Sequence, residues 1–196
     1  MNILPRQFYE RETTKVAQDL LGKILVREIG NQRITGRIVE TEAYAGFDDK
    51  ASHAHKGQTP RNSILFGPAG FAYVYFTYGL HHLFNIVTED VNFPSAVLVR
   101  AIEPISGIEI IRENRPGRDY HELTSGPAKL TKALKIDKCF NGIDVTIEDD
   151  IWVEEGEEVL KSRIVSAPRV GVGYSEECRY WPWRFYIKDN LFVSKK

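Results

Sequence analysis

The chain has 196 residues, of which 42% are hydrophobic, 11% aromatic and 27% charged. A chain of this length is typical of one domain, expected to span residues 1–196, and it buries roughly 70% of its unfolded surface. The aromatic content argues against disorder, and the net charge of -1 argues against a uniformly basic nucleic-acid-binding protein.

The first part of the chain predicts a helix and then a pair of strands. Thr13-Thr14 is a typical helix cap, and the apolar pattern extends this helix to about Leu21. Residues 23–29 and 33–44 have the composition of strands and flank the turn-forming pair Gly30-Asn31. An aspartate at position 48 or 49 indicates a short helix up to residue 55, and residues 58–62 indicate a loop.

The rest of the chain predicts a β-hairpin, further strands and two helices. Residues 71–77 and 81–87 are rich in aromatic and β-branched side chains, so we expect a hairpin with Tyr78-Gly79 at its tip. The nearly continuous apolar run of residues 95–102 is typical of a central strand. Helices are expected at residues 105–114 and 127–134, and short strands at residues 151–154, 164–170 and 184–187. These elements predict an α+β fold with a curved, mainly antiparallel sheet, surrounding helices and a protruding hairpin.

Acidic and aromatic side chains share one face of the strand at residues 33–44. Glu40, Glu42 and Tyr44 point the same way, because side chains alternate along a strand. A buried carboxylate is costly unless it is paired, so this face predicts either a cleft or a structural ion pair with Arg37 or another base. His53 and His55 follow, but no Cys or third nearby His completes a metal site, and we expect no metal.

The hairpin sequence carries a second group of aromatic residues. Tyr73 and Tyr75 lie on one strand face, where aromatic residues usually pack in a core. Tyr78 differs because a hairpin tip offers little to pack against. A protruding side chain of this kind is typical of proteins that insert a wedge between base steps of DNA.

Charge is distributed unevenly along the chain. Residues 144–158 hold eight acidic residues and no Lys or Arg, so the other 181 residues carry a net charge of +7. A basic face and an acidic back are therefore compatible with the composition, but composition alone slightly favours an ordinary solvated charge run. No stretch approaches the ~20 apolar residues of a membrane span. The first residues lack the apolar core of a secretion signal, so we expect a cytoplasmic protein with reduced cysteines.

Several sequence blocks resemble the alkyladenine (3-methyladenine) DNA glycosylase family, the mixed α/β type without a helix-hairpin-helix motif. The resemblance covers nearly the whole chain, with the blocks in the family's order and at matching spacings. They are RIVETEAY at 37–44, QTPRN at 58–62, YVYFTYG at 73–79, VLVRAIEP at 97–104, SGPAKL at 125–130 and RVGVG at 169–173.

The resemblance implies a role for each matching position. Glu42 matches the carboxylate that activates the attacking water, and Arg100 matches the arginine that helps hold that water and the nearby phosphate. Tyr44 and His53 match one side of the pocket for the flipped base. Tyr75 matches the aromatic residue that stacks on the second face of the base. Asn85 matches the pocket amide that screens purines, and Tyr78 matches the side chain inserted into the minor groove.

The function implied is that of a monofunctional DNA glycosylase of base excision repair. Such an enzyme flips alkylated or deaminated purines (3-methyladenine, 7-methylguanine, hypoxanthine or ethenoadenine) out of duplex DNA and hydrolyses the N-glycosidic bond, leaving an abasic site. It needs no cofactor. We expect a monomer that binds damaged double-stranded DNA, associates with the nucleoid if the source is bacterial, and contacts no membrane. The candidate phosphate contacts are Lys56, Arg61, Lys129 and Arg169.

Two other functions are compatible with parts of the sequence. A non-catalytic module that binds damaged DNA would need the three tyrosines at 44, 75 and 78 but not Glu42. A small-molecule hydrolase would use Glu42 and His53, and its Tyr78 would pack in the core. Glu42 within the recognised block favours the glycosylase over both.

Overall fold

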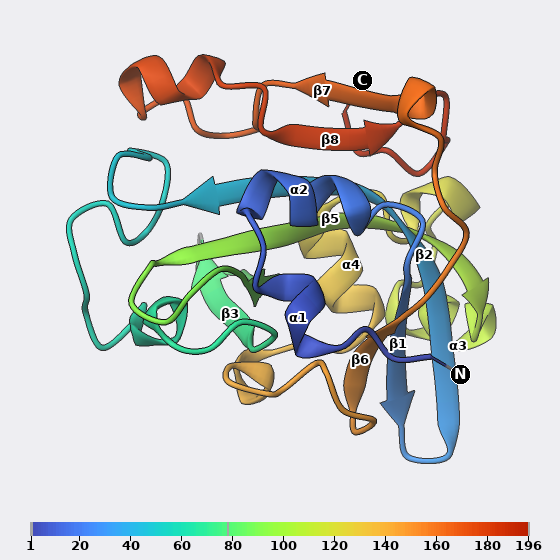
Figure 1. The fold of residues 1–196 in the computed structure, drawn as a ribbon. Coiled ribbons are helices and arrows are strands. Elements are labelled where there is room, and N and C mark those ends of the chain that lie inside the picture. Colours follow the sequence, from blue (N-terminus) through green and yellow to red (C-terminus); the bar gives the residue numbers. More distant parts are fainter. Residues whose placement is uncertain (1, 78, 196) are drawn as a thin grey trace.

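The fold is organised by an antiparallel sheet, shown in Figure 1 for a computed structural model that describes residues 2–77 and 79–195. Along its main path the strand order is β3-β4-β5-β2-β1-β6, and β8 pairs with both β2 and β7. All pairings are antiparallel. The strands are β1 (Ile24–Ile29), β2 (Gln32–Ala45), β3 (Ala72–Thr77), β4 (His81–Val87), β5 (Ser95–Ser106), β6 (Ile151–Glu154), β7 (Ile164–Ala167) and β8 (Arg184–Ile187).

Four short α-helices pack around this sheet. They are α1 (Arg6–Tyr9), α2 (Thr13–Asp19), α3 (Ile108–Asn114) and α4 (Pro127–Ala133). Helix α2 lies over β2 and β5 in Figure 1, and α4 is seen behind β5. Five 3₁₀ turns complete the described elements: η1 (Ser63–Phe66), η2 (Tyr120–Glu122), η3 (Lys138–Phe140), η4 (Lys161–Arg163) and η5 (Glu176–Tyr180). The α+β class predicted from the sequence is confirmed.

Strand β2 separates the apolar core from a polar face. On the side of α2, the Thr41 hydroxyl donates to the Ala17 carbonyl at 2.7 Å, and the largely aliphatic core fills the space below. The alternate residues Glu40 and Glu42 point to the other side. The second half of β2 pairs with β8 as well as β5, and a register irregularity falls at Glu40. Buried acidic side chains are therefore enclosed on a strand that has a neighbour on each edge.

The structure corrects three predicted boundaries. The helix after Glu12 starts at Thr13, whose hydroxyl bonds Thr88 rather than capping the helix. The helix expected at residues 105–114 is α3, which starts at Ile108 because β5 continues to Ser106. Gly107 makes the break with φ 71°, where a Cβ atom would lie 2.8 Å from the Arg33 carbonyl.

No helix forms between residues 48 and 55, where the structure has turns. The Asp49 carboxylate accepts the backbone N–H of Ala51 at 3.0 Å, which gives a local turn in place of a helix cap. The last strand segment is also shorter than predicted, since β7 ends at Ala167. The predicted hairpin is confirmed as β3 and β4. Tyr78, which the sequence places at the expected tip, lies outside the described residues.

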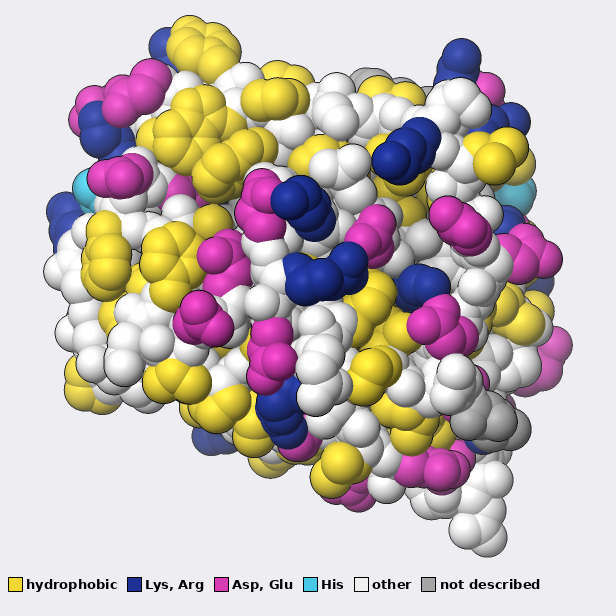
Figure 2. Space-filling view, in the orientation of Figure 1, with side chains coloured by type: hydrophobic (Ala, Val, Ile, Leu, Met, Phe, Trp, Pro, Cys, Tyr) yellow, Lys and Arg dark blue, Asp and Glu magenta, His cyan; other side chains and the backbone are white. Residues whose placement is uncertain are grey.

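The acidic segment 144–158 begins beside Phe71, just before β3, where Asp144 forms an isolated bridge. It continues to β6, which is at the opposite end of the strand order from the hairpin. Figure 2 shows the face over α1 and α2, where acidic and basic side chains are interspersed. Within the described part of the chain, no helix is long and apolar enough to cross a membrane.

Candidate active site

A cavity of about 330 Å³ opens beside the polar end of β2. Its walls come from β2, β3, β4, β5, the start of α4 and the segment 170–174. It is lined by the six predicted site residues that the structure describes, Glu42, Tyr44, His53, Tyr75, Asn85 and Arg100. A volume of this size is in the range of small-molecule sites in proteins. Residues from five separate stretches of sequence therefore meet at one place.

Glu42 is held at the inner end of the cavity by three hydrogen bonds. Its Oε2 accepts the Tyr44 hydroxyl at 2.8 Å and Arg100 Nη1 at 3.1 Å, and its Oε1 accepts the backbone N–H of Val170 at 2.7 Å. The side chain is fully buried. Donors on both oxygens stabilise the ionised carboxylate, which could not otherwise be buried without a large desolvation cost.

Arg100 joins Glu42 to a second buried carboxylate. Arg100 Nε donates to Glu40 Oε1 at 2.9 Å, and the same oxygen accepts Arg184 Nη1 at 3.0 Å. We call these four residues (Glu40, Glu42, Arg100 and Arg184) the Arg100 cluster. It holds two negative and two positive charges, and none of the four side chains is more than 7% exposed. The carboxylates are thus paired with Arg100 and Arg184, whereas Arg37 pairs with Glu103.

Tyr44 lies between Glu42 and a separate buried arginine. Its hydroxyl donates to Glu42, and Arg169 Cζ lies 4.7 Å from the centre of its ring. Burial, and secondarily the Glu42 carboxylate, raise the pKa of Tyr44 well above its usual value. The phenol is therefore protonated at neutral pH and acts as a donor to Glu42.

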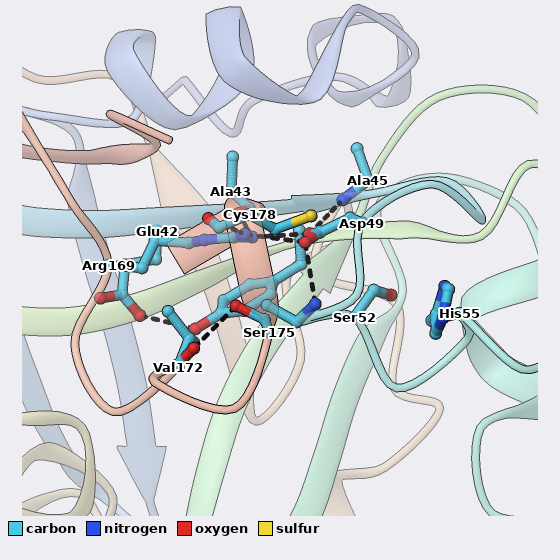
Figure 3. Close-up of polar contacts among 12 residues, drawn as sticks. Glu42, Ala43, Ala45, Asp49, Ser52, His55, Arg169, Val172, Ser175 and Cys178 are labelled. Atoms are coloured by element: carbon cyan, nitrogen blue, oxygen red, sulfur yellow. Dashed lines mark hydrogen bonds and ion pairs between the residues drawn. The ribbon is translucent and has the colours of Figure 1, made fainter. Parts of the chain in front are cut away.

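The side chains of Arg169 and Asp49 form a two-bond ion pair that has no exposed surface. Arg169 Nη1 and Nη2 donate to the two Asp49 oxygens at 2.6 and 2.7 Å, and Nη1 also donates to the Ala43 carbonyl at 2.8 Å (Figure 3). Arg169 is therefore not available as a phosphate contact, and that prediction is wrong. The same pairing ties the end of β2 to the segment that carries Val170.

Aromatic rings form the outer wall of the cavity. The Tyr73 and Tyr75 ring centres are 5.4 Å apart, and the His53 ring meets Tyr75 edge-on at 4.3 Å. His53 Nδ1 is hydrogen-bonded to the Tyr73 hydroxyl at 2.9 Å. Desolvation, and to a lesser degree Arg61, lower the pKa of His53, while burial raises the pKa of Tyr73 to about 12. His53 is therefore neutral at pH 7, and His55 makes a different contact, to the Phe47 carbonyl.

Asn85 supplies a buried amide to the cavity from β4. Its Nδ2 donates to the Tyr73 carbonyl at 3.0 Å, which fixes the amide plane. Among the described residues no hydrogen bond is made to its Oδ1. The cavity thus combines an ionised carboxylate, flat aromatic faces and one polar amide.

The remaining phosphate candidates differ in availability. Arg61 is exposed near the cavity, where its Nη2 donates to the Phe76 carbonyl at 2.8 Å. Lys56 is also exposed, whereas Lys129 is bonded to Glu122 at 3.3 Å. The pair of Lys129 with Glu122 is partly exposed, so Lys129, like Arg61 and Lys56, remains a prediction as a DNA contact.

Sequence reasoning missed four contributors to this site. They are Arg184, Asp49, Ser194 and the Val170 backbone N–H. Arg184, Ser194 and Val170 are distant from Glu42 in sequence, whereas Asp49 is close to it but pairs with the distant Arg169. Glu40 was noticed on the same strand face but was given no role. The paired acidic residues of β2 were a signal that two buried cations had to exist, since unpaired buried carboxylates are costly.

A buried carboxylate–arginine pair thus lies at the inner end of an aromatic cavity. The sequence profile of the methylpurine-DNA glycosylase (MPG) family matches residues 7–191, and the chain belongs to this family. The protein is therefore a hydrolytic N-glycosylase that acts on DNA, and its role is in DNA repair.

Relatives of the chain cover it almost completely. A candidate 3-methyladenine DNA glycosylase of Methanocella arvoryzae is 51% identical over 100% of this chain and 98% of that protein. Proteins of the same description from Desulfitobacterium hafniense and Carboxydothermus hydrogenoformans are 47% and 49% identical. These two matches span 100% and 99% of this chain, and 100% of each relative.

Proposed function

We propose that the protein is a monofunctional glycosylase that removes alkylated or deaminated purines from duplex DNA. The substrates are 3-methyladenine, 7-methylguanine, hypoxanthine and ethenoadenine, and the product is an abasic site. The observation that carries the proposal is the position of Glu42, whose ionised carboxylate adjoins Arg100 at the inner end of an aromatic cavity. The relatives named for 3-methyladenine support the substrate class.

The damaged base enters the cavity after it is flipped out of the helix. Flipping costs a few kcal/mol, and less for damaged or mispaired bases. The His53 ring contacts Tyr75 edge-on at 4.3 Å, so no base fits between these two rings and the expected place of His53 on the Tyr44 side does not hold. In the cavity the base lies between Tyr44 on one face and Tyr75 with His53 on the other, and Asn85 meets its polar edge. A cationic alkylated purine gains most from this setting, because aromatic faces attract cations.

Glu42 acts as the general base on the attacking water. Breaking an N-glycosidic bond builds positive charge on the sugar, as in glycoside hydrolysis, and a nearby carboxylate stabilises that charge. Among the described residues Glu42 Oε1 accepts only the Val170 N–H. A carboxylate oxygen has two lone pairs, so Oε1 keeps the capacity to accept a second donor such as water, while the Glu42 side chain has no surface open to solvent in this structure.

The charge of the leaving base determines the relative rates at which the substrates are released. An alkylated purine is already cationic and departs as a neutral base, whereas hypoxanthine and ethenoadenine need a proton. His53 is a poor proton donor because its pKa is lowered. We therefore expect 3-methyladenine and 7-methylguanine to be released faster than the neutral bases.

The chemistry stops at the abasic site. A lyase step needs an amine nucleophile, and no lysine is among the described residues that line the cavity. The protein acts as a monomer, without a cofactor.

The proposal is tested with a panel of duplexes that each carry one lesion. The expected result is release of the lesion base and formation of an alkali-labile site, with no strand cleavage before alkali treatment. Binding without release would instead show a non-catalytic binding module. Neither binding nor release on any duplex would overturn the proposal and favour a small-molecule hydrolase.

Tyr78 is assigned the space vacated by the flipped base. It lies outside the described residues, and the assignment depends on the hairpin and the family resemblance. A Tyr78→Ser variant is expected to lose flipping, measured as 2-aminopurine fluorescence beside the lesion, more than it loses overall stability. Val91→Ser, an exposed apolar residue outside the hairpin, is the matched control. Equal flipping and release by Tyr78→Ser and wild type would remove Tyr78 from this role.

A further inference from the structure

All three guanidinium nitrogens of Arg100 are bonded within the protein. Nη1 donates to Glu42 at 3.1 Å, Nε to Glu40 at 2.9 Å and Nη2 to the Ser194 hydroxyl at 3.1 Å. A guanidinium is a rigid planar fork, so fixing two of its nitrogens fixes the direction of the third. The Nη1 that reaches Glu42 is therefore aimed by the partners of the other two nitrogens.

Glu40 is the central acceptor behind Arg100. Its Oε1 accepts Arg100 Nε and Arg184 Nη1, and its Oε2 accepts the backbone N–H of Ser194 at 2.7 Å. The side chain has no exposed surface, and it is not among the residues that line the cavity. Glu40 thus contacts Arg100 from the side remote from the substrate site.

Ser194 closes a ring with Glu40 and Arg100. Its N–H donates to Glu40 and its hydroxyl accepts from Arg100. The segment that carries it is anchored on both sides of Ser194. Phe192 is buried against Tyr120, with ring centres 5.3 Å apart, and the Lys195 carbonyl accepts Arg184 Nη1 at 2.7 Å.

The charges of the Arg100 cluster explain why the orientation of Arg100 depends on Glu40. With Glu40 ionised, the two arginines face two carboxylates, and all four side chains are nearly or fully buried. If Glu40 becomes neutral, two buried guanidinium groups face only Glu42. The hydrogen bond from Arg100 Nε to residue 40 then loses its charge assistance, so Arg100 is held less firmly in its present direction.

We propose that Glu40 and Ser194 are positioning residues that hold Arg100 in the orientation in which it contacts Glu42. The inference rests on the proposed function, in which Glu42 and Arg100 act on the attacking water. It assigns a functional role to residues that do not touch the substrate, one on β2 and one in the segment after β8.

Single-turnover base release measures the effect of this orientation. Glu40→Gln keeps the size of the side chain and is expected to slow release roughly 10–100-fold, as small misplacements of catalytic groups do. Ser194→Ala removes one hydrogen bond and is expected to slow release about threefold to tenfold. Thr41→Val, which removes a buried hydrogen bond on the opposite face of β2, is the matched control and keeps the wild-type rate.

A double-mutant cycle separates positioning from general destabilisation. In an Arg100→Ala background, Glu40→Gln and Ser194→Ala are expected to slow release no further, because their effect passes through Arg100. Losses that multiply in the double variants would overturn the inference. Wild-type rates for both single variants would overturn it as well.

Exchange of the Arg100 Nε–H with solvent, followed spectroscopically, reports how firmly Arg100 is held, independently of activity. The Arg100 Nε–H, assigned by its loss in Arg100→Lys, should exchange slowly with solvent in the wild type and rapidly in Glu40→Gln. Unchanged exchange in Glu40→Gln overturns the inference even if the enzyme acts on DNA. Failure of the wild type to release any base, with the exchange result as expected, overturns the proposed function but not the Glu40–Arg100 contact.

Discussion

Two buried groups of arginines and carboxylates lie on either side of Tyr44, and they have different surroundings. The Arg100 cluster reaches the cavity through Glu42 and Arg100, whereas the Arg169–Asp49 pair is enclosed by protein. Tyr44 contacts both, since its hydroxyl donates to Glu42 and its ring lies over Arg169. The same residue types therefore border a cavity in one place, where we propose that they serve a reaction, and are enclosed by protein in the other.

The difference follows from what each carboxylate accepts. Both Asp49 oxygens accept a guanidinium N–H, and each accepts a backbone N–H as well, from Ala45 or Ala51. Glu42 Oε1 accepts one N–H among the described residues, beside a cavity. A fully satisfied carboxylate stabilises the fold, while one with spare capacity next to a cavity can bind a water.

The largest expected effect is on activity, from Glu42→Gln. General-base help contributes about 10²–10⁴-fold to a rate, so single-turnover base release should fall by about that factor. Binding to the lesion duplex should persist, since the side chain keeps its size. Glu103→Gln, in the partly exposed pair with Arg37, is the control. Base release at the wild-type rate by Glu42→Gln would remove Glu42 from the base role.

The next effect is on stability, from Asp49→Ala. Removing one partner of a buried ion pair leaves an uncompensated charge and costs about 3–5 kcal/mol. The free energy of unfolding in urea should fall by this amount for Asp49→Ala. The double variant Asp49→Ala with Arg169→Met should recover part of the loss, because no charge is then left buried. A wild-type unfolding free energy for Asp49→Ala would contradict the structural role.

Tyr44→Phe tests the residue that contacts both groups. A hydrogen bond to a charged group contributes about 1.5–3 kcal/mol, so losing it should slow base release roughly tenfold to hundredfold. The ring is kept, so stacking on the base and the contact with Arg169 remain. Tyr180→Phe, at an exposed tyrosine, should leave base release unchanged. An equal rate for Tyr44→Phe and wild type would show that Glu42 does not depend on this donor.

The smallest expected effect appears at high pH, at Tyr73. Burial raises its pKa to about 12, above the value of about 10 in an unfolded chain. The contribution of the protonated Tyr73 phenol to the free energy of unfolding is therefore complete below pH 10. It is lost as the pH rises towards 12. Between these values the slope of unfolding free energy against pH should be shallower in Tyr73→Phe by up to about 1.4 kcal/mol per pH unit. Identical slopes in urea titrations would contradict the raised pKa.

Local pattern was enough to predict most of the elements. The β3–β4 hairpin and the long β2 strand follow from period-two alternation and from turn residues such as Gly30, which are local properties. The helix expected at 48–55 is absent: the structure has turns there, where Asp49 accepts the Ala51 N–H and also pairs with Arg169, 120 residues away. The start of α3 was misplaced because strand pairing with Thr35 continues β5 to Ser106.

The sequence by itself determined the alternating face of β2, the hairpin, the family and hence the class of reaction. It also indicated that the carboxylates on this face of β2 needed either a cleft or a cationic partner. Only the tertiary structure decided which cations those are, because Arg100, Arg184 and Arg169 come from strands and segments far from β2 in sequence. It alone showed that the Ser194 backbone and hydroxyl complete the setting of Arg100. Periodicity reports which side of a strand is buried, but not which distant atoms meet there.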